Sequence, residues 1–394
     1  MNVMRHLRVP NQSVQDVIVL LKDNDLLYYG MRIFPDSDGE HRLIPISDTA
    51  PTILPPYLRE FDEIAHQGKT DERTNEGWWD YLSEMIGEDT VREHGESWPS
   101  NHEFIGDIMI VRINEEVSPY RQAIALSKME SHPKVRVVME DRGVQGELRI
   151  RNLTPIAFRH NSEIFTGDFP PEMCNTRVFV RESGKSILCD PTKAYFSTKL
   201  QTERLETLEL ARQLRELVGR PIRVCDPFCG VGPVLANLIS ENGLISDVLA
   251  TDLNPDAVEM LFDNLRRWDA RTYPKEPIAI ERIYSDRIIG IADASSLADI
   301  PEVRNSWDMV IVNLPHRTVE MLPKLIPLLD TSSPSMIRGR VVVAESDIEA
   351  TNRRITDILP PLLIGRPPVR LKVKRDYSST LRLCSFEAWL APMP

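Results

Sequence analysis

The stretch Cys225-Asp-Pro-Phe-Cys-Gly-Val-Gly-Pro233 decides the predicted fold of this 394-residue chain. It begins at the last residue of a strand-like segment at residues 222–225 and leads into an apolar, helix-like segment at 234–239. A glycine-rich turn between a strand and a helix directs backbone N–H groups and the helix N-terminus toward a nucleotide-like ligand. The stretch therefore predicts a sheet whose first strand ends at a ligand site.

The sequence after this turn alternates strand-like and helix-like segments, which is typical of a doubly wound parallel sheet. We expect strands at residues 222–225, 248–252, 288–292, 309–312, 339–344 and 370–374, and an antiparallel last strand at 381–390. We expect helices at 202–218, 234–239 and 256–267, the last one capped by Asn254 with Pro255 in its first turn.

Composition divides the chain into four segments. Residues 1–57 read as a small N-terminal domain with a helix at 13–24 followed by two short strands. Residues 58–103 form an acidic linker or insertion, since 59–103 hold 13 acidic residues against 4 basic ones. Residues 104–195 combine short strands with a helix at 120–130, as an α+β domain on the RNA side would, and 196–394 form the Rossmann-like domain.

Charge and cysteine content limit the class of protein. The net charge is −12, but basic residues cluster at 366–375, so a phosphate-binding surface is compatible with this composition. The five cysteines are odd in number and lack CxxC spacing, which predicts buried thiols and no metal site. No apolar run is long enough to span a bilayer, and we expect a cytoplasmic protein that does not bind membranes.

Three acidic residues are expected at successive strand ends, where they would surround one cofactor. Asp226 begins the glycine-rich turn, Asp252 lies 20 residues beyond Gly232, and Asp293 ends the third strand. A carboxylate at the second strand end binds ribose hydroxyls. Gly230 and Gly232 lack the third glycine of a dinucleotide turn, so the set favours S-adenosylmethionine, with NAD as the alternative. Phe228 would pack beside the cofactor or in the core.

A second motif, Asn313-Leu-Pro-His316, directly follows the apolar run 308–312 and lies about 80 residues beyond the glycine-rich turn. The Asn amide and the carbonyl beside Pro315 can form hydrogen bonds with the edge of a flat, polar base. In isolation the motif also fits a strand that ends in an ordinary proline turn. With the cofactor set, it predicts methyl transfer.

Six ordered motifs resemble the archaeal and eukaryotic tRNA (guanine-N1)-methyltransferases, which act on position 37 beside the anticodon. They are Gly146-Glu-Leu-Arg149-Ile-Arg151, Tyr195-Phe-Ser-Thr-Lys-Leu-Gln-Thr-Glu203-Arg204, Asp226-Pro-Phe-Cys-Gly-Val-Gly-Pro233, Thr251-Asp-Leu-Asn-Pro255, Val312-Asn-Leu-Pro-His316 and Arg375-Asp-Tyr-Ser378. The resemblance implies a class I S-adenosylmethionine-dependent methyltransferase domain with a small N-terminal tRNA-recognition domain.

The resemblance also implies roles for individual residues. Glu203 would remove the N1 proton as general base, and Arg149 would stabilise negative charge on O6. Asn313 would orient the base, and Pro315 would fix its loop. The cofactor would be surrounded by Tyr195, Arg204, Asp226, Phe228, Gly230, Gly232, Asp252, Leu253, Asp293 and Ala294. On position alone, Glu203 also fits a carboxylate that stabilises a helix N-terminus.

The resulting expectation is a monomeric enzyme that methylates N1 of guanosine 37 in tRNA. One alternative is the sister family that transfers the 3-amino-3-carboxypropyl group of the same cofactor during wybutosine synthesis. Another is a non-catalytic tRNA-binding protein. The retention of Gly230, Gly232, Asp252, Asn313 and Glu203 argues against that second alternative.

Overall fold

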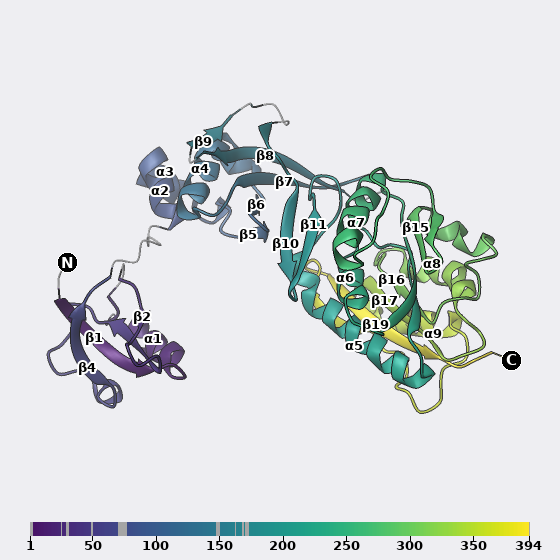
Figure 1. Cartoon of the computed structure of the whole chain (residues 1–394). Coiled ribbons are helices and arrows are strands. Elements are labelled where there is room, and N and C mark those ends of the chain that lie inside the picture. Colours follow the sequence, from purple (N-terminus) through teal and green to yellow (C-terminus); the bar gives the residue numbers. More distant parts are fainter. Residues whose placement is uncertain are drawn as a thin grey trace. The chain divides into compact units, whose positions relative to one another are not determined.

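The computed structural model describes residues 3–24, 26–28, 31–48, 50–69, 77–146, 150–161, 163–167, 169 and 173–393. The chain forms two compact units (Figure 1). The first comprises Met1–Glu93 with Glu130–Pro133, and the second comprises His94–Met129 with Lys134–Pro394.

The first unit contains an antiparallel sheet of order β2-β3-β1-β4. Its strands are β1 (Val3–Pro10), β2 (Phe34–Pro35), β3 (His41–Pro45) and β4 (Asp62–Gln67). The helix α1 (Val14–Asp23) packs on this sheet, because Val17 and Leu21 share a buried cluster with Leu7 and Ile44. Since β4 pairs with β1, the N-terminal sheet continues beyond residue 57.

Two short helices follow in the acidic stretch, α2 (Trp78–Ile86) and α3 (Glu88–His94). Trp78 and Leu82 are the buried side chains of α2, whereas α3 buries none. The described part of the stretch 58–103 is therefore more than a linker or insertion, because it contains β4, a strand of the N-terminal sheet, as well as these helices.

The second unit begins with a five-stranded sheet of order β5-β6-β7-β8-β9. Its strands are β5 (His102–Ile105), β6 (Ile108–Val111), β7 (Val137–Gln145), β8 (Ile150–His160) and β9 (Glu163–Thr166). The helix α4 (Arg121–Ser131) joins the parallel strands β6 and β7 and packs on the sheet through Ala125 and Met129. A separate antiparallel hairpin consists of β10 (Val178–Glu182) and β11 (Lys185–Cys189).

The main sheet has eight strands in the order β14-β15-β13-β12-β16-β17-β19-β18. These are β12 (Ile222–Asp226), β13 (Ile245–Asp252), β14 (Glu281–Tyr284), β15 (Arg287–Ile291), β16 (Met309–Val312), β17 (Ser335–Ala344), β18 (Lys372–Asp376) and β19 (Leu381–Leu390). The central strands are parallel, whereas β19 is antiparallel to β17, as expected.

Helices cover both faces of this sheet (Figure 1). One core contains residues of α5 (Gln201–Val218), α6 (Pro233–Ile239) and α7 (Pro255–Trp268), and the other contains residues of α8 (Thr318–Leu325) and α9 (Ile348–Ile358). Successive strand residues point to opposite faces, so Val224 lies in the first core and Cys225 in the second. This two-sided burial explains the continuous apolar strands.

The predicted strands and helices of the parallel sheet are confirmed. Asn254 caps α7, because its side-chain oxygen accepts a hydrogen bond from the Asp256 N–H (3.0 Å). The strand order reverses between β12 and β16, and ligands of such sheets bind outside the carboxyl ends at that point. Among the described residues, no helix has the length and apolar character needed to cross a membrane.

Candidate active site

The glycine-rich turn joins the end of β12 to the start of α6. Gly230 and Gly232 adopt positive φ values of 54° and 81°, which side chains other than glycine rarely tolerate. A Cβ atom on Gly232 would lie 2.5 Å from Leu261 Cδ1, whereas one on Gly230 would meet no atom within 4 Å. Gly232 is therefore required by packing, and the open space at Gly230 can receive a ligand.

Asp252 ends β13 beside this turn. Its carboxylate accepts hydrogen bonds from the Gly230 N–H (2.8 Å) and the Asn254 N–H (2.9 Å). Burial raises the pKa of Asp252, although these two N–H groups oppose the shift. The residue thus fixes the turn and keeps oxygen lone pairs for a ligand hydroxyl.

Asp226 is the most unusual carboxyl group of the site. It is buried, and its Oδ1 atom receives no hydrogen bond from the described part of the chain. Burial raises the pKa of Asp226 to about 7, with the charge of Asp252 acting in the same direction. An orphaned buried carboxylate oxygen suits a cationic ligand group such as the ammonium of S-adenosylmethionine.

The remaining predicted cofactor residues fall into two environments. Tyr195 and Leu253 are 49% and 50% exposed, so their side chains are available to a ligand. Ala294 is buried in the core of the α8 and α9 face, and Phe228 packs partly against that core. Asp293 accepts hydrogen bonds from the Ser295 N–H and hydroxyl (2.8 Å each), which lower its pKa.

Arg204 is held inside the protein. Its guanidinium donates to the Glu182 carboxylate and to the Ser197 carbonyl (2.9 Å), and it lies 5.1 Å from the Phe196 ring centre. Both charged side chains of this ion pair are buried. The geometry gives Arg204 a structural partner, and its contact with a cofactor stays a prediction.

The transfer site lies where the start of α5 meets the ends of β16 and β17. Glu203 is buried in the first turn of α5. Arg340 Nε of β17 lies 2.8 Å from Glu203 Oε2, and its Nη1 donates to Asn313 Oδ1 (2.8 Å). The Pro315 carbonyl accepts a hydrogen bond from the Val342 N–H (2.9 Å), which fixes the loop to β17. Glu203 and Asn313 are thus brought together as predicted.

Arg340 was missed by reasoning from the sequence. A usable signal existed, because Arg338 and Arg340 alternate within an otherwise apolar strand and must face the same side. Arginines buried on one face of a strand need acidic partners. The partners themselves lie far away in the sequence, on α5.

Arg149, predicted to stabilise O6, lies outside the described residues. The neighbouring Arg151 is held by Glu103 (2.9 Å) and Asp141 (2.8 Å). In the first unit, Arg5 pairs with Glu63, and Arg8 pairs with Asp36. Their charges are therefore compensated within the first unit.

Tyr377, in the last of the six motifs, lies beside the transfer loop. Its hydroxyl is 3.0 Å from His316 Nε2, and the two rings pack edge to face. The motifs Asn313-Leu-Pro-His316 and Arg375-Asp-Tyr-Ser378 are therefore adjacent in the fold.

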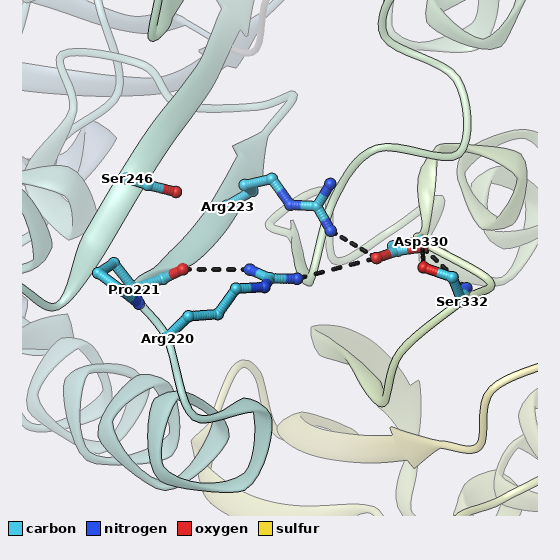
Figure 2. Close-up of a pocket in the computed structure, with 6 residues that line it drawn as sticks. All are labelled: Arg220, Pro221, Arg223, Ser246, Asp330 and Ser332. Atoms are coloured by element: carbon cyan, nitrogen blue, oxygen red, sulfur yellow. Dashed lines mark hydrogen bonds and ion pairs between the residues drawn. The ribbon is translucent and has the colours of Figure 1, made fainter.

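A pocket of about 430 Å³ lies at the opposite, amino-terminal edge of the sheet. Figure 2 shows the guanidinium groups of Arg220 and Arg223 turned toward Asp330. Asp308 also accepts hydrogen bonds from both arginines, and these outweigh the effect of burial and lower its pKa. The arginine charges are therefore compensated by Asp308 and Asp330.

The sheet order and the residues at its carboxyl edge define the fold of a class I S-adenosylmethionine-dependent methyltransferase. Residues 178–334 match the family model described as the TRM5/TYW2 methyltransferase domain. Residues 80–157 match the model described as the TYW2 N-terminal domain. The match of residues 178–334 agrees with the resemblance found in the motifs.

Relatives with related sequences bear a common name. The tRNA (guanine(37)-N(1))-methyltransferase Trm5b of Pyrococcus abyssi is 28% identical over 59% of this chain and 57% of its own length. The Trm5b of Methanocaldococcus jannaschii is 25% identical over 82% of this chain and 83% of its own. The crystal structure of wild-type Trm5b from P. abyssi has a TM-score of 0.60 at 21% identity, covering 98% of this chain and 99% of that one.

Proposed function

We propose that this chain transfers a methyl group from S-adenosylmethionine to N1 of guanosine 37 of tRNA. The observation that carries this proposal is the buried group of Glu203, Arg340 and Asn313 beside the cofactor edge of the sheet. This group places the Glu203 carboxylate, which can accept a proton, near the Asn313 amide, which can form hydrogen bonds with a base. The names of the Trm5b relatives supply the nucleoside and its position.

The chain holds suitable groups for each part of the cofactor. Asp226 would bind the ammonium, Asp252 the ribose hydroxyls, and Tyr195 and Leu253 would cover the adenosine. The bend at Gly230 leaves room for close approach. When bound, S-adenosylmethionine supplies an electrophilic methyl group on a sulfonium.

The transfer residues act on the base. Guanine N1 carries a proton at neutral pH, so Glu203 accepts this proton as N1 becomes methylated. Because Glu203 Oε2 is in contact with Arg340 Nε (2.8 Å), the proton is accepted by the other carboxylate oxygen, Oε1. Asn313 binds the edge of the base, and the hydrogen bond from the Val342 N–H to the Pro315 carbonyl holds the loop in place. Arg149 stabilises the negative charge on O6.

The substrate base must leave its stack to reach this buried carboxylate. We therefore propose that tRNA binds with guanosine 37 flipped out and that the first unit contributes to recognition of tRNA shape. We further propose that the enzyme works as a monomer in the cytoplasm. Sedimentation at micromolar concentration tests the monomer, with a concentration-dependent dimer as the opposing result.

A second candidate is the transfer of the 3-amino-3-carboxypropyl group. The match of residues 80–157 to the TYW2 N-terminal domain is the observation in its favour. This reaction needs no removal of an N1 proton, so it leaves the buried Glu203 without a role.

One assay separates these candidates. Purified protein is incubated with tRNA transcripts carrying guanosine or adenosine at position 37. S-adenosylmethionine is labelled in its methyl group in one arm and in its carboxyl group in the other. The proposal expects methyl label in N1-methylguanosine from the guanosine transcript alone. Carboxyl label in the product would establish the second candidate, and equal label from both transcripts would exclude guanosine specificity.

A further inference from the structure

Arg340 connects the two predicted transfer residues through one buried guanidinium. Its Nε atom forms an ion pair with Glu203 Oε2, and its Nη1 donates to Asn313 Oδ1 (2.8 Å each). The side chains of Arg340 and Glu203 are each 7% exposed. The arginine backbone is held as well, because its carbonyl accepts a hydrogen bond from the Thr318 hydroxyl (2.6 Å).

We infer that Arg340 is a positioning residue that keeps Glu203 ionised and turns the Asn313 amide so that it selects a keto base. This inference rests on the proposed function and deepens it. Arg340 would thus fix two features of the site before the substrate binds. They are the charge of the Glu203 carboxylate and the orientation of the Asn313 amide.

The orientation of Asn313 follows from the chemistry of arginine. A guanidinium has donors and no acceptor, so the amide oxygen must face Arg340. The two N–H groups of Asn313 then remain for the substrate. They can donate hydrogen bonds to a carbonyl oxygen such as O6 of guanine. The 6-amino group of adenine is itself a donor, so it cannot accept hydrogen bonds from them.

Arg340 is a cation in contact with the buried Glu203 carboxylate. A buried carboxylate without a counter-charge is strongly disfavoured, and an opposite charge in contact favours the charged form. Burial lowers the pKa of Arg340, the charge of Glu203 offsets part of this effect, and the charges of Arg338 and Arg204 add to it. The charge of Arg340 in turn lowers the pKa of Asp226.

Arg338 provides a matched control on the same face of the same strand. It is buried like Arg340, but its guanidinium binds Glu206 (2.9 Å) and Glu387 (3.2 Å). Glu206 also contacts Lys374 (2.6 Å), so it keeps a cationic partner when Arg338 is replaced. The two arginines therefore form ion pairs with different carboxylates: Arg340 with Glu203, and Arg338 with Glu206 and Glu387.

The test compares Arg340→Met with Arg338→Met. The rate constant kcat/KM is measured from pH 5.5 to 9 on transcripts carrying guanosine or adenosine at position 37. For Arg340→Met we expect a loss of about 100-fold at pH 7, an acidic limb moved at least one unit to higher pH, and a smaller preference for guanosine. Arg338→Met should keep the wild-type pH profile and preference.

Two further measurements keep the outcome decisive. Arg340→Lys, which retains the charge but cannot span both partners, should keep the pH profile and lose base preference. Carbon-13 NMR of the Glu203 carboxyl, assigned with Glu203→Gln, reports its ionisation without any tRNA. Wild-type protein that makes no N1-methylguanosine defeats the proposed function, whereas unchanged Glu203 ionisation and unchanged pH profile in Arg340→Met overturn the role of Arg340.

Discussion

The substitution Asp226→Asn is expected to stabilise the free protein at alkaline pH while weakening cofactor binding. The Asp226 carboxyl is buried and its Oδ1 lacks a hydrogen bond from the described residues. In its ionised form it carries a desolvation cost that an amide of the same shape avoids. The amide also lacks the negative charge proposed to hold the ammonium group.

The size of the expected change in the free energy of unfolding follows from the raised pKa of Asp226. Burial raises this pKa from 3.8 to about 7, so between these values the folded protein binds more protons than the unfolded one. The free energy of unfolding therefore falls as pH rises through this window. At 1.36 kcal/mol per unit, the ionised carboxyl costs about 4 kcal/mol above pH 8, and this cost disappears below pH 4.

Urea unfolding of wild type and Asp226→Asn between pH 5 and 8.5 measures this effect. The stability gain should grow with pH, and calorimetric titration at pH 8 should show cofactor affinity reduced at least tenfold. Asp330→Asn is the control, because hydrogen bonds from Ser332 and Ser333 outweigh burial and lower the pKa of Asp330 to about 2. That substitution should reduce stability and leave cofactor affinity within twofold.

A stability gain that is equal at pH 5 and pH 8.5 would mean that the Asp226 carboxylate is solvated or paired in solution. Wild-type cofactor affinity in Asp226→Asn would mean that this carboxylate does not hold the ammonium group.

Three other substitutions test separate parts of the site. Glu203→Gln should retain cofactor affinity within twofold and lower single-turnover methylation by about 100-fold or more; unchanged turnover would remove Glu203 as the base. Gly232→Ala should lower Tm more than Gly230→Ala, because its Cβ meets Leu261 at 2.5 Å, and an equal change in both melting curves would contradict this packing argument. Asn264→Ala removes hydrogen bonds to the Leu188 N–H (2.7 Å), the Leu188 carbonyl and the Val231 carbonyl (2.9 Å each). We expect it to reduce the free energy of unfolding by about 3 kcal/mol, and a loss below 0.5 kcal/mol would show that water replaces these bonds.

The convergence of three strand-end residues was predictable because parallel strands end on the same side of a sheet. Asp226, Asp252 and Asn313 each follow an apolar run, so their convergence follows from strand order alone. The antiparallel last strand was also predictable from its apolar pattern at 381–390. The register of these strands and the contacts of α5 were not, because they depend on packing between distant segments.

Partners of buried charges were the least predictable feature. Arg204 was expected at the cofactor through the family resemblance, yet its guanidinium is engaged by Glu182 and the Ser197 carbonyl. Nothing local in the helix pattern distinguishes Arg204 from an exposed arginine. Likewise, β4 was hidden in an acidic stretch, and its pairing with β1 depends on residues more than 50 positions away.

The two halves of the site treat buried carboxylates differently, and the substrates explain the difference. Among the described residues, Asp226 Oδ1 has no hydrogen-bond donor, and the charge of Arg340 lowers the pKa of Asp226 without a direct contact, whereas Glu203 is in contact with Arg340. The cofactor brings its own ammonium charge, so a protein cation in contact with Asp226 would compete with it. Guanine is neutral and brings no counter-charge, so the protein must supply one if Glu203 is to be ionised before the base arrives. An exchange of these arrangements would leave a neutral acid at the transfer site and an occupied carboxylate at the cofactor site.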